Sequence, residues 1–379
     1  MTAAFWTILA LIVWSLGGYG LTWIALARVW PRRSPAPEVP QCATMLIAAR
    51  NEEAGIGAKI TSVLAQETGP HALEILVVSD GSEDATVARA RAAAGGDPTV
   101  TVVETPDHGG KAAALNHGLA MIGDDRVVIF SDANSILAPG AVRALLAPLG
   151  DPGVGGTMGQ LDIPDGGGPL DRAERLFWRY DNAMKAAEDR IGGAVSAQGT
   201  LYAVRRALVR PVPEGMADDL VTSLAVVDQG HRLAFASGAV AREGVTGRVG
   251  AEMARRLRST ERGWRGLMAF ARLMNPARTG AYAVQLFNHK LMRRVVAFLL
   301  PALFVLNLPL LDDGWVYGVL FALQVAVHGG ALLAWGTGLR FPGASVLVLF
   351  TLGHAVIAWA IVRWAAGVRT TKWAPVRDG

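Results

Sequence analysis

The stretch Val127-Val128-Ile129-Phe130-Ser131-Asp132-Ala133-Asn134 decides the fold of this chain. Its four apolar residues predict a buried parallel strand, and the run ends in an acid and an amide two positions apart. Ligands collect at the carboxyl ends of strands in open α/β sheets, so we expect Asp132 and Asn134 to face a ligand crevice. A carboxylate beside a second oxygen ligand suits a divalent cation on a diphosphate. Asp and Asn are also common turn residues, so the stretch alone leaves both interpretations open.

The composition lies between that of a soluble protein and that of a membrane protein. Of the 379 residues, 51% are hydrophobic and 18% are charged, which predicts a soluble domain with membrane-spanning segments. A single cysteine, Cys42, excludes a disulfide framework and a cysteine-built metal site, and it fits a cytosolic catalytic domain. The net charge of +4 comes from arginines near apolar segments. This pattern favours contact with anionic membrane lipids and argues against nucleic acid as a partner.

The first 40 residues predict a membrane anchor and a linker. Residues 1–30 contain an apolar run long enough to cross a bilayer, and no small-residue cleavage site follows it, so we interpret them as a retained transmembrane helix. Arginines after the run place the following domain in the cytoplasm under the positive-inside rule, at a bacterial-type inner or plasma membrane. Residues 31–40 carry four prolines and indicate a stiff linker.

Residues 41–250 alternate between strand and helix patterns. This alternation predicts an α/β domain with a parallel, doubly wound sheet. The glycine-rich passage 150–169 indicates a mobile loop over the crevice, and a helix is expected over 171–190. The predicted strands are Thr44–Ala49, Glu74–Ser79, Val100–Glu104, Val127–Phe130, Gln198–Ala203 and Leu233–Ser237.

The C-terminal third predicts helices on and in the membrane. Residues 251–290 are expected to form amphipathic interfacial helices, because the helix over 251–274 carries arginines on one face and an apolar stripe with Trp264 on the other. A surface helix packed on the core is the alternative. Three apolar runs within 291–366 are each near spanning length, and 367–379 is a tail. A multi-pass protein with four spanning segments and its N-terminus outside would have its C-terminus outside as well. The basic residues near the C-terminus favour the cytoplasm, so the side on which the C-terminus lies stays open.

Polar residues follow the predicted strands at several points. Asp80 can accept a hydrogen bond from a uracil imide or a sugar hydroxyl. Gly109 and Gly110 offer backbone amides to a phosphate, beside the point charge of Lys111. Asp218 and Asp219 begin a later helix, where one of them can act as a general base or simply cap the helix.

In this order, the motifs resemble those of family 2 glycosyltransferases, above all the membrane-bound branch with the cellulose, hyaluronan and chitin synthases. The resemblance covers roughly residues 41–290. It implies a GT-A fold, inverting transfer from a nucleotide sugar (usually a UDP-sugar) to a glycan or lipid acceptor, and a divalent cation, Mg or Mn. The matching motifs are Ala49-Arg50-Asn51-Glu52-Glu53, Ser79-Asp80-Gly81-Ser82-x-Asp84, Gly110-Lys111 with Leu115-Asn116, Ser131-Asp132-Ala133-Asn134 and Ala217-Asp218-Asp219.

The resemblance also implies roles for individual residues. Asp219 matches the catalytic base, and Asp132 with Asn134 would hold the metal. The implied donor-binding residues are Ala49, Asn51, Glu52, Asp80, Lys111, Asp132 and Arg262. The implied acceptor-binding residues are Gln198, Gly199, Thr200, Asp218 and Trp264.

Two departures from the family pattern bear on function. Asn134 replaces the second acid of the D-x-D motif, which removes one formal charge from the metal ligands. The Q-x-x-R-W motif survives only as Arg262-Gly263-Trp264, so processive synthesis and single addition both stay open.

Two other classes compete with the glycosyltransferase. A nucleotidyltransferase-like enzyme needs a glycine-rich signature near the first strand, and residues 48–51 do not supply one. A transport subunit with an inactive sheet domain would explain His328 and His354 inside apolar segments, although hydrogen bonds between helices explain them more simply. The retained Asp80, Asp132 and Asp219 argue against an inactive domain.

Overall fold

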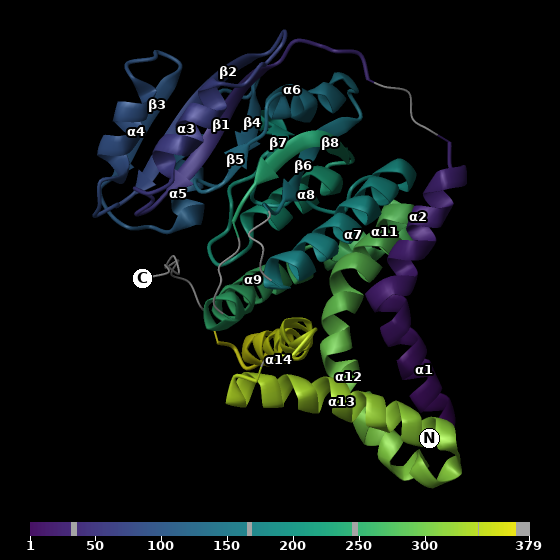
Figure 1. Ribbon diagram of the computed structural model, residues 1–379. Helices are drawn as coiled ribbons and strands as arrows, with labels where there is room; N and C mark the ends of the chain where they lie inside the picture. The colour runs from purple at the N-terminus through teal and green to yellow at the C-terminus, as the bar shows by residue number, and fades with distance from the viewer. Residues whose placement is uncertain (32–35, 165–168, 245–248, 340, 369–379) are drawn as a thin grey trace.

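The computed structural model describes residues 1–31, 36–164, 169–244, 249–339 and 341–368. An α/β domain occupies one end of the molecule and long apolar helices occupy the other (Figure 1). Much of the predicted linker, at residues 32–35, and nearly all of the predicted tail lie outside the described residues.

The described part of the α/β domain contains one eight-stranded sheet with the order β3-β2-β1-β4-β7-β6-β8-β5. The first four strands of this order are parallel, as predicted. The second half is mixed, because β7 enters between β4 and β6 and runs antiparallel to both. The strands are β1 Cys42–Ala49, β2 Ala72–Asp80, β3 Val100–Thr105, β4 Val127–Phe130, β5 Ile136–Leu137, β6 Val154–Asp162, β7 Tyr202–Arg205 and β8 Arg232–Arg242.

Helices cover both faces of the sheet, because successive side chains of a strand point to opposite faces. Ile47 and Ile129 pack on the face covered by α3 and α6, whereas Leu46 and Phe130 pack on the face covered by α5 and α8. The helices of this domain are α3 Ile56–Leu64, α4 Thr86–Ala94, α5 Lys111–Leu119, α6 Ala141–Leu146, α7 Pro169–Ile191 and α8 Asp218–Asp228, with short 3₁₀ turns η2 Ala147–Gly150 and η3 Arg206–Leu208.

Strand β6 contradicts the prediction of a mobile loop over 150–169. It lies inside the sheet, antiparallel to β7 and parallel to β8. Its glycines permit close contact with neighbouring strands: a Cβ on Gly156 would lie 3.0 Å from the carbonyl oxygen of Ala203. The glycines therefore serve packing here, and their usual association with loops misled the sequence analysis. Residues 165–168 of the predicted loop lie outside the described residues.

Within the described residues, four helical segments are long and apolar enough to cross a membrane: Thr2–Val29, Ala281–Asp313, Trp315–Thr337 and Ala344–Ala365. Their number matches the prediction. The second begins about ten residues before the predicted boundary at 290. The first comprises α1 Thr2–Val13, the π-helical turn η1 Trp14–Gly18 and α2 Tyr19–Val29; the second comprises α11 Ala281–Leu286, the π-helical turn η5 Phe287–Met292, α12 Arg293–Asn307 and η6 Leu308–Asp313; the others are α13 and α14.

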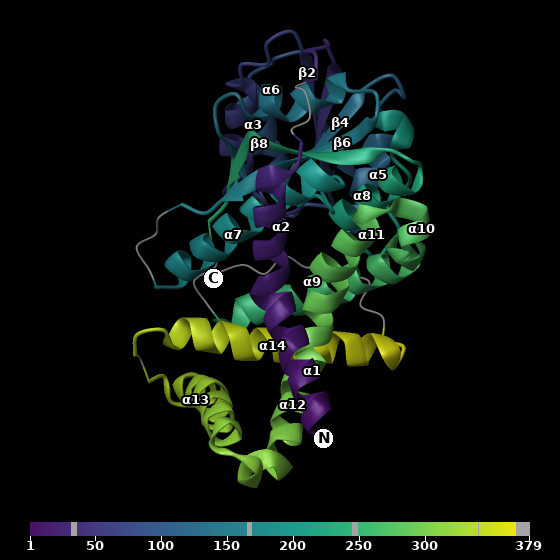
Figure 2. The same cartoon turned by 90° about the vertical axis from the view of Figure 1, so that its right-hand side faces the viewer.

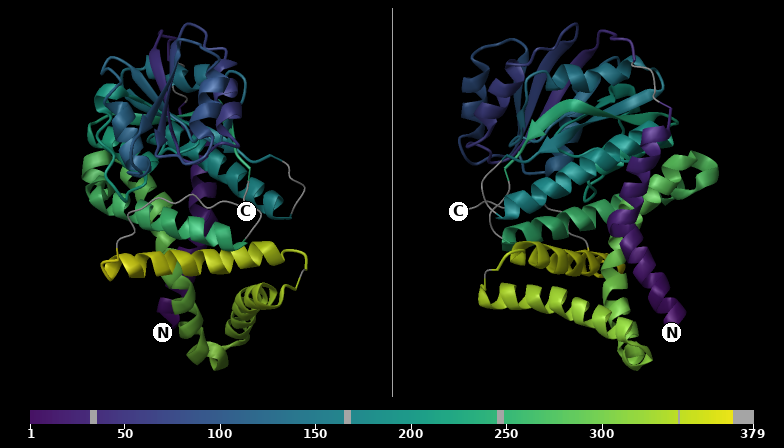
Figure 3. Two further views of the ribbon diagram at one scale, coloured as in Figure 1. Left: turned by 90° about the vertical axis from the view of Figure 1, so that its left-hand side faces the viewer. Right: turned by 45° about the vertical axis from the view of Figure 1, so that its right-hand side comes forward.

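The apolar helices do not all run in one direction. Helix α1 packs along α12 through Phe5 and Val296. Figures 2 and 3 show α14 lying across these helices, beneath α9 (Val249–Ala269). His328 of α13 lies 3.0 Å from the Thr351 hydroxyl of α14, which is the hydrogen bond between helices that we expected. For His354 this expectation is wrong, because its Nδ1 lies 2.7 Å from the carbonyl oxygen of Phe350 in the same helix.

Helix α9 packs on α14 through the residue that we expected to face lipid. Trp264 is only 9% exposed, and its ring lies 5.9 Å from the ring of Trp364 in a T-shaped contact. Glu261 pairs with Arg363 at 2.9 Å beside it. The expected lipid-facing stripe is therefore covered by α14, which corresponds to the packed alternative. The helix also ends earlier than predicted, and is followed by η4 Ala271–Met274 and α10 Pro276–Thr279.

A buried polar network fixes the α/β domain to the first two apolar segments. In α7, Glu188 accepts a hydrogen bond from the Tyr19 hydroxyl at 2.7 Å, and His289 Nδ1 lies 2.9 Å from the same carboxylate. Asp181 pairs with Lys185 at 2.6 Å and with Arg293 at 3.0 Å. Removing one partner of such a buried pair leaves an uncompensated charge, so this network ties the three segments together.

Candidate active site

Three predicted site residues meet at the carboxyl end of β4. Lys111 begins α5, Asp132 follows β4, and Asp218 begins α8. The ammonium of Lys111 lies 2.8 Å from Asp132 and 3.2 Å from Asp218. Burial opposes the charge of Lys111, but the two carboxylates outweigh burial and raise its pKa. Burial likewise acts to raise the pKa of Asp132, and the adjacent ammonium outweighs it and lowers that pKa. This arrangement holds a permanent positive charge between two acids.

Asp219 has the properties of a general base. It is the second residue of α8, and its Oδ1 accepts a hydrogen bond from the backbone N–H of Leu220 at 2.7 Å. Burial and the neighbouring Asp218 carboxylate raise its pKa to about 6, while Lys111 and Lys290 oppose that rise. A carboxylate with this pKa is mostly deprotonated at neutral pH and is still basic enough to accept a proton in a transition state.

Asp80 holds a loop in the structure. It is 1% exposed, and its two oxygens accept hydrogen bonds from the backbone N–H groups of Gly109 and Gly110, both at 2.9 Å. His108 Nδ1 lies 2.7 Å from the same carboxylate. The expectation that these glycine amides are open to a phosphate is therefore wrong for this structure, because Asp80 already occupies them.

A cavity of about 480 Å³ opens beside this loop, at the carboxyl ends of β2 and β3. Its position suits a nucleoside, because ligands of open α/β sheets bind beyond the carboxyl ends of parallel strands. It is lined by Ser79, Gly81, Ser82, Glu83, Glu104, Thr105, Pro106, Asp107 and His108.

Three predicted donor-binding residues join β1 to this region. Asn51 has a left-handed backbone (φ 52°), a conformation that Asn tolerates better than most residues. Its Oδ1 accepts a hydrogen bond from the N–H of Glu83 at 2.8 Å, and the N–H of Glu52 donates to the Thr86 hydroxyl at 2.7 Å. Ala49 is buried at the end of β1. Ala49, Asn51 and Glu52 do not line the nucleoside-sized cavity themselves; Asn51 holds the backbone of Glu83, which does.

The predicted acceptor segment lies directly against Asp132. A Cβ on Gly199 would lie 3.1 Å from Asp132 Oδ2, so only glycine permits this approach without a shift. The carbonyl oxygen of Thr200 accepts a hydrogen bond from the Ser131 hydroxyl at 2.6 Å. Gln198 Oε1 is buried and has no hydrogen-bond partner within the described part of the chain. A buried acceptor without a partner costs about 1–3 kcal/mol, which a hydroxyl of a bound ligand would relieve.

Lys59 is a site residue that the sequence analysis missed. It is fully buried, and its ammonium donates to the hydroxyls of Ser131 at 2.6 Å and Ser135 at 3.1 Å. Burial lowers its pKa to about 7, against the opposing charges of Asp132 and Glu243. The signal was present in the sequence, because this lysine falls on the apolar face of α3 that carries Ile56 and Ile60.

The residues around Asn134 fit a hard divalent cation. Asn134 Nδ2 donates to Glu243 Oε1 at 3.0 Å, which leaves the amide oxygen for a metal. Burial and the charge of Asp132 raise the pKa of Glu243 to about 7, so two carboxylates oppose each other at this point. Among the described residues no group of three His, Cys, Asp or Glu side chains forms a metal cluster. The available donors are thus two carboxylates and one amide oxygen, all of the oxygen type that Mg²⁺ and Mn²⁺ prefer.

The two predicted residues of α9 point to different places. Arg262 lines a small cavity together with Gly109, Lys111 and Asp218. Trp264 packs on α14 as described above, and this cavity is not among its contacts.

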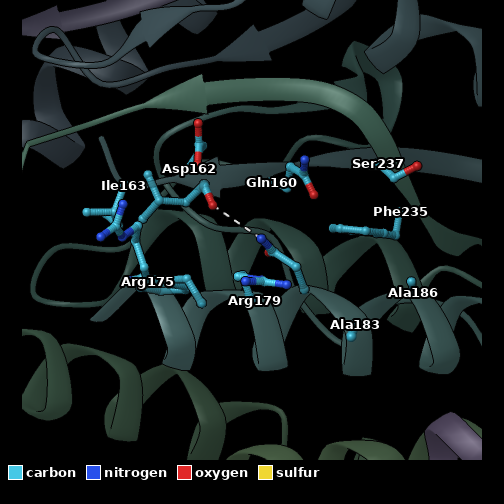
Figure 4. A pocket seen from close by; sticks show the side chains of 12 residues that line it. Gln160, Asp162, Ile163, Arg175, Arg179, Ala183, Ala186, Phe235 and Ser237 are labelled. Atoms are coloured by element: carbon cyan, nitrogen blue, oxygen red, sulfur yellow. Dashed lines mark hydrogen bonds between the residues drawn. The ribbon is translucent and has the colours of Figure 1, made fainter. Parts of the chain in front are cut away.

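A further cavity, of about 360 Å³, separates α7 from β6 and β8. Figure 4 shows Arg175 and Arg179 of α7 on one side and Gln160 and Asp162 of β6 on the other. The backbone N–H of Glu243 donates to the carbonyl of Asp162 at 3.4 Å, so this cavity adjoins the acidic group at Asn134. No local pattern predicts this cavity, because its walls come from α7, β6 and β8, which meet only in the folded chain.

This sheet, with a nucleoside-sized cavity, a bridging lysine and a buried aspartate at its carboxyl edge, is compatible with a glycosyltransferase of the GT-A class. The chain belongs to glycosyltransferase family 2: residues 40–264, more than half of its length, match the model described as "Glycosyltransferase like family 2". The predicted family, GT-A fold and enzyme class are therefore confirmed.

Individual relatives agree with this assignment. An N-acetylglucosaminyltransferase of Rhizobium meliloti (strain 1021) is 25% identical over 57% of this chain and 53% of its own length. The succinoglycan biosynthesis protein ExoU of the same strain is 34% identical over 28% of this chain and 30% of its own. The chain spans about half the length of the N-acetylglucosaminyltransferases that it matches.

One solved structure resembles nearly the whole chain. It is the mannosyltransferase PcManGT from Pyrobaculum calidifontis, in complex with GDP-Man and Mn²⁺. The alignment covers 95% of this chain and 98% of the other at 23% identity, with a TM-score of 0.70. At this identity the likeness establishes the shared fold.

Proposed function

We propose that this protein is a membrane-bound inverting glycosyltransferase. It transfers a hexosyl group from a nucleotide sugar, for which we propose a UDP-sugar, to a hydroxyl of a glycan or lipid acceptor. The names of its relatives, which include N-acetylglucosaminyltransferases and a succinoglycan biosynthesis protein, support a role in building glycans. Processive synthesis and single addition remain alternative forms of this activity.

The observation that carries the proposal is the position of Asp219. Its carboxylate lies next to Asp218, which pairs with Lys111, and its pKa is raised to about 6. Asp219 takes the proton of the acceptor hydroxyl while that oxygen attacks the anomeric carbon. The bond from the anomeric carbon to the diphosphate oxygen breaks on the opposite face, so the configuration inverts and no enzyme nucleophile is needed.

Positive charges of the chain stabilise the leaving group. Lys111 and Arg262 line the same cavity, and their charges oppose the negative charge that develops on the diphosphate. A guanidinium also binds two phosphate oxygens at once. When bound at Asp132, Asn134 and Glu243, Mg²⁺ or Mn²⁺ supplies further positive charge to the diphosphate. The Mn²⁺ in the mannosyltransferase complex supports this assignment.

The apolar helices support reaction at a membrane surface. We propose that they anchor the protein in a bacterial inner membrane with the catalytic domain on the cytoplasmic side, where nucleotide sugars are available. Four segments of spanning length and the arginines that follow the first one support this topology.

A screen of radiolabelled nucleotide sugars tests the proposal. Full-length protein in native lipid is incubated with each donor and Mn²⁺, and both free nucleotide and labelled product are measured. We expect turnover with one donor in the wild type and about 10²–10⁴-fold slower turnover with Asp219→Asn. Absence of turnover with every donor, in protein that still binds nucleoside diphosphate, would contradict the proposed activity.

A further inference from the structure

Two basic residues of the second apolar segment, Lys290 and Arg294, interact electrostatically with Asp219. Lys290 lies in η5 and Arg294 in α12, one helical turn later. Arg294 Nη1 donates to the carbonyl of Lys290 at 2.7 Å. A Cβ on Gly263 would lie 2.9 Å from Arg294 Nη2, so the guanidinium lies against the residue that follows Arg262. The charges of both residues interact with that of Asp219.

These two residues differ from the basic residues around them. His289 and Arg293, their neighbours in the chain, pair with Glu188 and Asp181. Lys290 and Arg294 form no ion pair with any carboxylate in the part of the chain that the structure describes. Partly buried cations without a direct ion pair are costly, and a bound anion relieves that cost.

The anion they attract differs from the leaving diphosphate. The small cavity beside which we propose that the diphosphate binds is lined by Lys111 and Arg262, which come from α5 and α9, and Lys290 and Arg294 are not among its lining residues. Lys290 and Arg294 approach Asp219 from a segment that continues into the apolar helix α12. A general base takes its proton from the acceptor, so the acceptor must bind beside Asp219. Positive charge near Asp219 therefore acts on a group of the acceptor.

We propose that Lys290 and Arg294 form an anion site for the acceptor, which carries a phosphate or carboxylate near the hydroxyl that becomes glycosylated. This inference rests on the proposed function of Asp219 as the base. The shared chemistry is a compact oxyanion beside a hydroxyl, and its two sources are the headgroup of a phospholipid and an acidic sugar.

Paired probes test the site. Each pair differs only by the anionic group: glycerol 1-phosphate against glycerol for the headgroup, and methyl glucuronide against methyl glucoside for the sugar. Calorimetry measures the binding of each probe to full-length protein saturated with nucleoside diphosphate and Mn²⁺. The variants are Lys290→Met, Arg294→Met and both together, with Lys290→Arg as the conservative exchange. Arg272→Met, which alters an exposed arginine paired with Asp228, is the matched control.

We expect one anionic probe to bind roughly tenfold or more tightly than its neutral partner, through charge-assisted hydrogen bonds. The double variant removes this preference, Lys290→Arg retains most of it, and the control leaves it unchanged. The probe pair in which the anionic member is favoured more strongly shows whether the anion of the acceptor belongs to a phospholipid headgroup or to an acidic sugar. Equal binding of charged and neutral probes to the wild type overturns the proposal. Loss of nucleoside diphosphate affinity in the double variant also overturns it, because the cations then serve the donor. Binding is measured without turnover, so this result stands apart from any failure of the donor screen.

Discussion

The two halves of the sheet are built in different ways. In the half formed by β3, β2, β1 and β4, parallel strands end directly in polar residues. Each motif therefore lies at the carboxyl edge of the sheet, directly after its own strand. In the half formed by β7, β6, β8 and β5, the strands are mixed, and the polar groups around them come from distant segments. Glu243 meets Asn134, and Gly199 meets Asp132, only through tertiary contacts. The comparison suggests that donor binding is encoded locally, whereas acceptor activation is assembled from several parts of the chain.

The largest effect is expected from removing the base. Asp219→Asn keeps the size of the side chain and removes its basicity, so kcat should fall by about 10²–10⁴-fold. Turnover is measured at saturating donor and acceptor. Asp228→Asn, at the other end of α8 and paired with surface arginines, is the control and should retain most of the activity. An Asp219→Asn enzyme as fast as this control would remove Asp219 from the mechanism.

The second-largest effect is expected in the half formed by β3, β2, β1 and β4, where we propose that the donor binds. Asp80→Ala releases the N–H groups of Gly109 and Gly110 and the ring of His108, which loosens the wall of the nucleoside-sized cavity. Loss of hydrogen bonds to a charged group, at about 1.5–3 kcal/mol, should raise the donor KM by roughly tenfold to a hundredfold. Steady-state kinetics with varied donor measures this change. If the acceptor KM rises instead, the two halves do not divide the substrates as proposed.

The pH dependence of kcat tests whether Asp219 is the general base. Because the pKa of Asp219 is raised to about 6, the reactive carboxylate is lost as pH falls through 6, and kcat should drop about tenfold per pH unit below that value. Asp218→Asn removes a negative neighbour that raises this pKa, so the acid limb should move to lower pH. A shift to higher pH, or no acid limb at all, would be inconsistent with Asp219 as the titrating group.

The smallest effect is expected from changing one proposed metal ligand, in Asn134→Asp. Activity should disappear in excess chelator and return with Mn²⁺ or Mg²⁺. Asn134→Asp adds a negative charge beside Asp132 and Glu243, so it should tighten Mn²⁺ binding, by roughly tenfold or less. Paramagnetic resonance of free Mn²⁺ measures this without turnover. Unchanged affinity would place the cation elsewhere, and full activity in chelator would leave Lys111 and Arg262 to stabilise the diphosphate alone.

The same difference between the halves explains what the sequence predicted. Strands β1, β2 and β4 were predicted within two residues at each end, because apolar runs and the acids that follow them are local signals. Asp132, Lys111 and Asp218 were each identified from their own motifs. To predict that these three residues meet, the only further rule needed is that ligands gather at the carboxyl ends of strands.

The remaining features depend on contacts that no local pattern records. Glu243 joins Asn134 across 109 positions, and its own surroundings in the sequence resemble an ordinary strand end. Strand β6 was missed because its glycines fit against neighbouring strands that the sequence does not reveal. Trp264 was assigned to lipid because helical periodicity identifies an apolar face without identifying what covers it.

We propose that one half of the sheet binds the donor and the other activates the acceptor. Calorimetric titration of nucleoside diphosphate with Mn²⁺ into two variants, Asp80→Ala and Asp219→Asn, tests this proposal most directly. We expect Asp80→Ala to lose affinity by roughly tenfold or more, whereas Asp219→Asn should bind within about twofold of the wild type. An equal loss in both variants, or a loss confined to Asp219→Asn, would contradict it, because the base would then belong to the donor site.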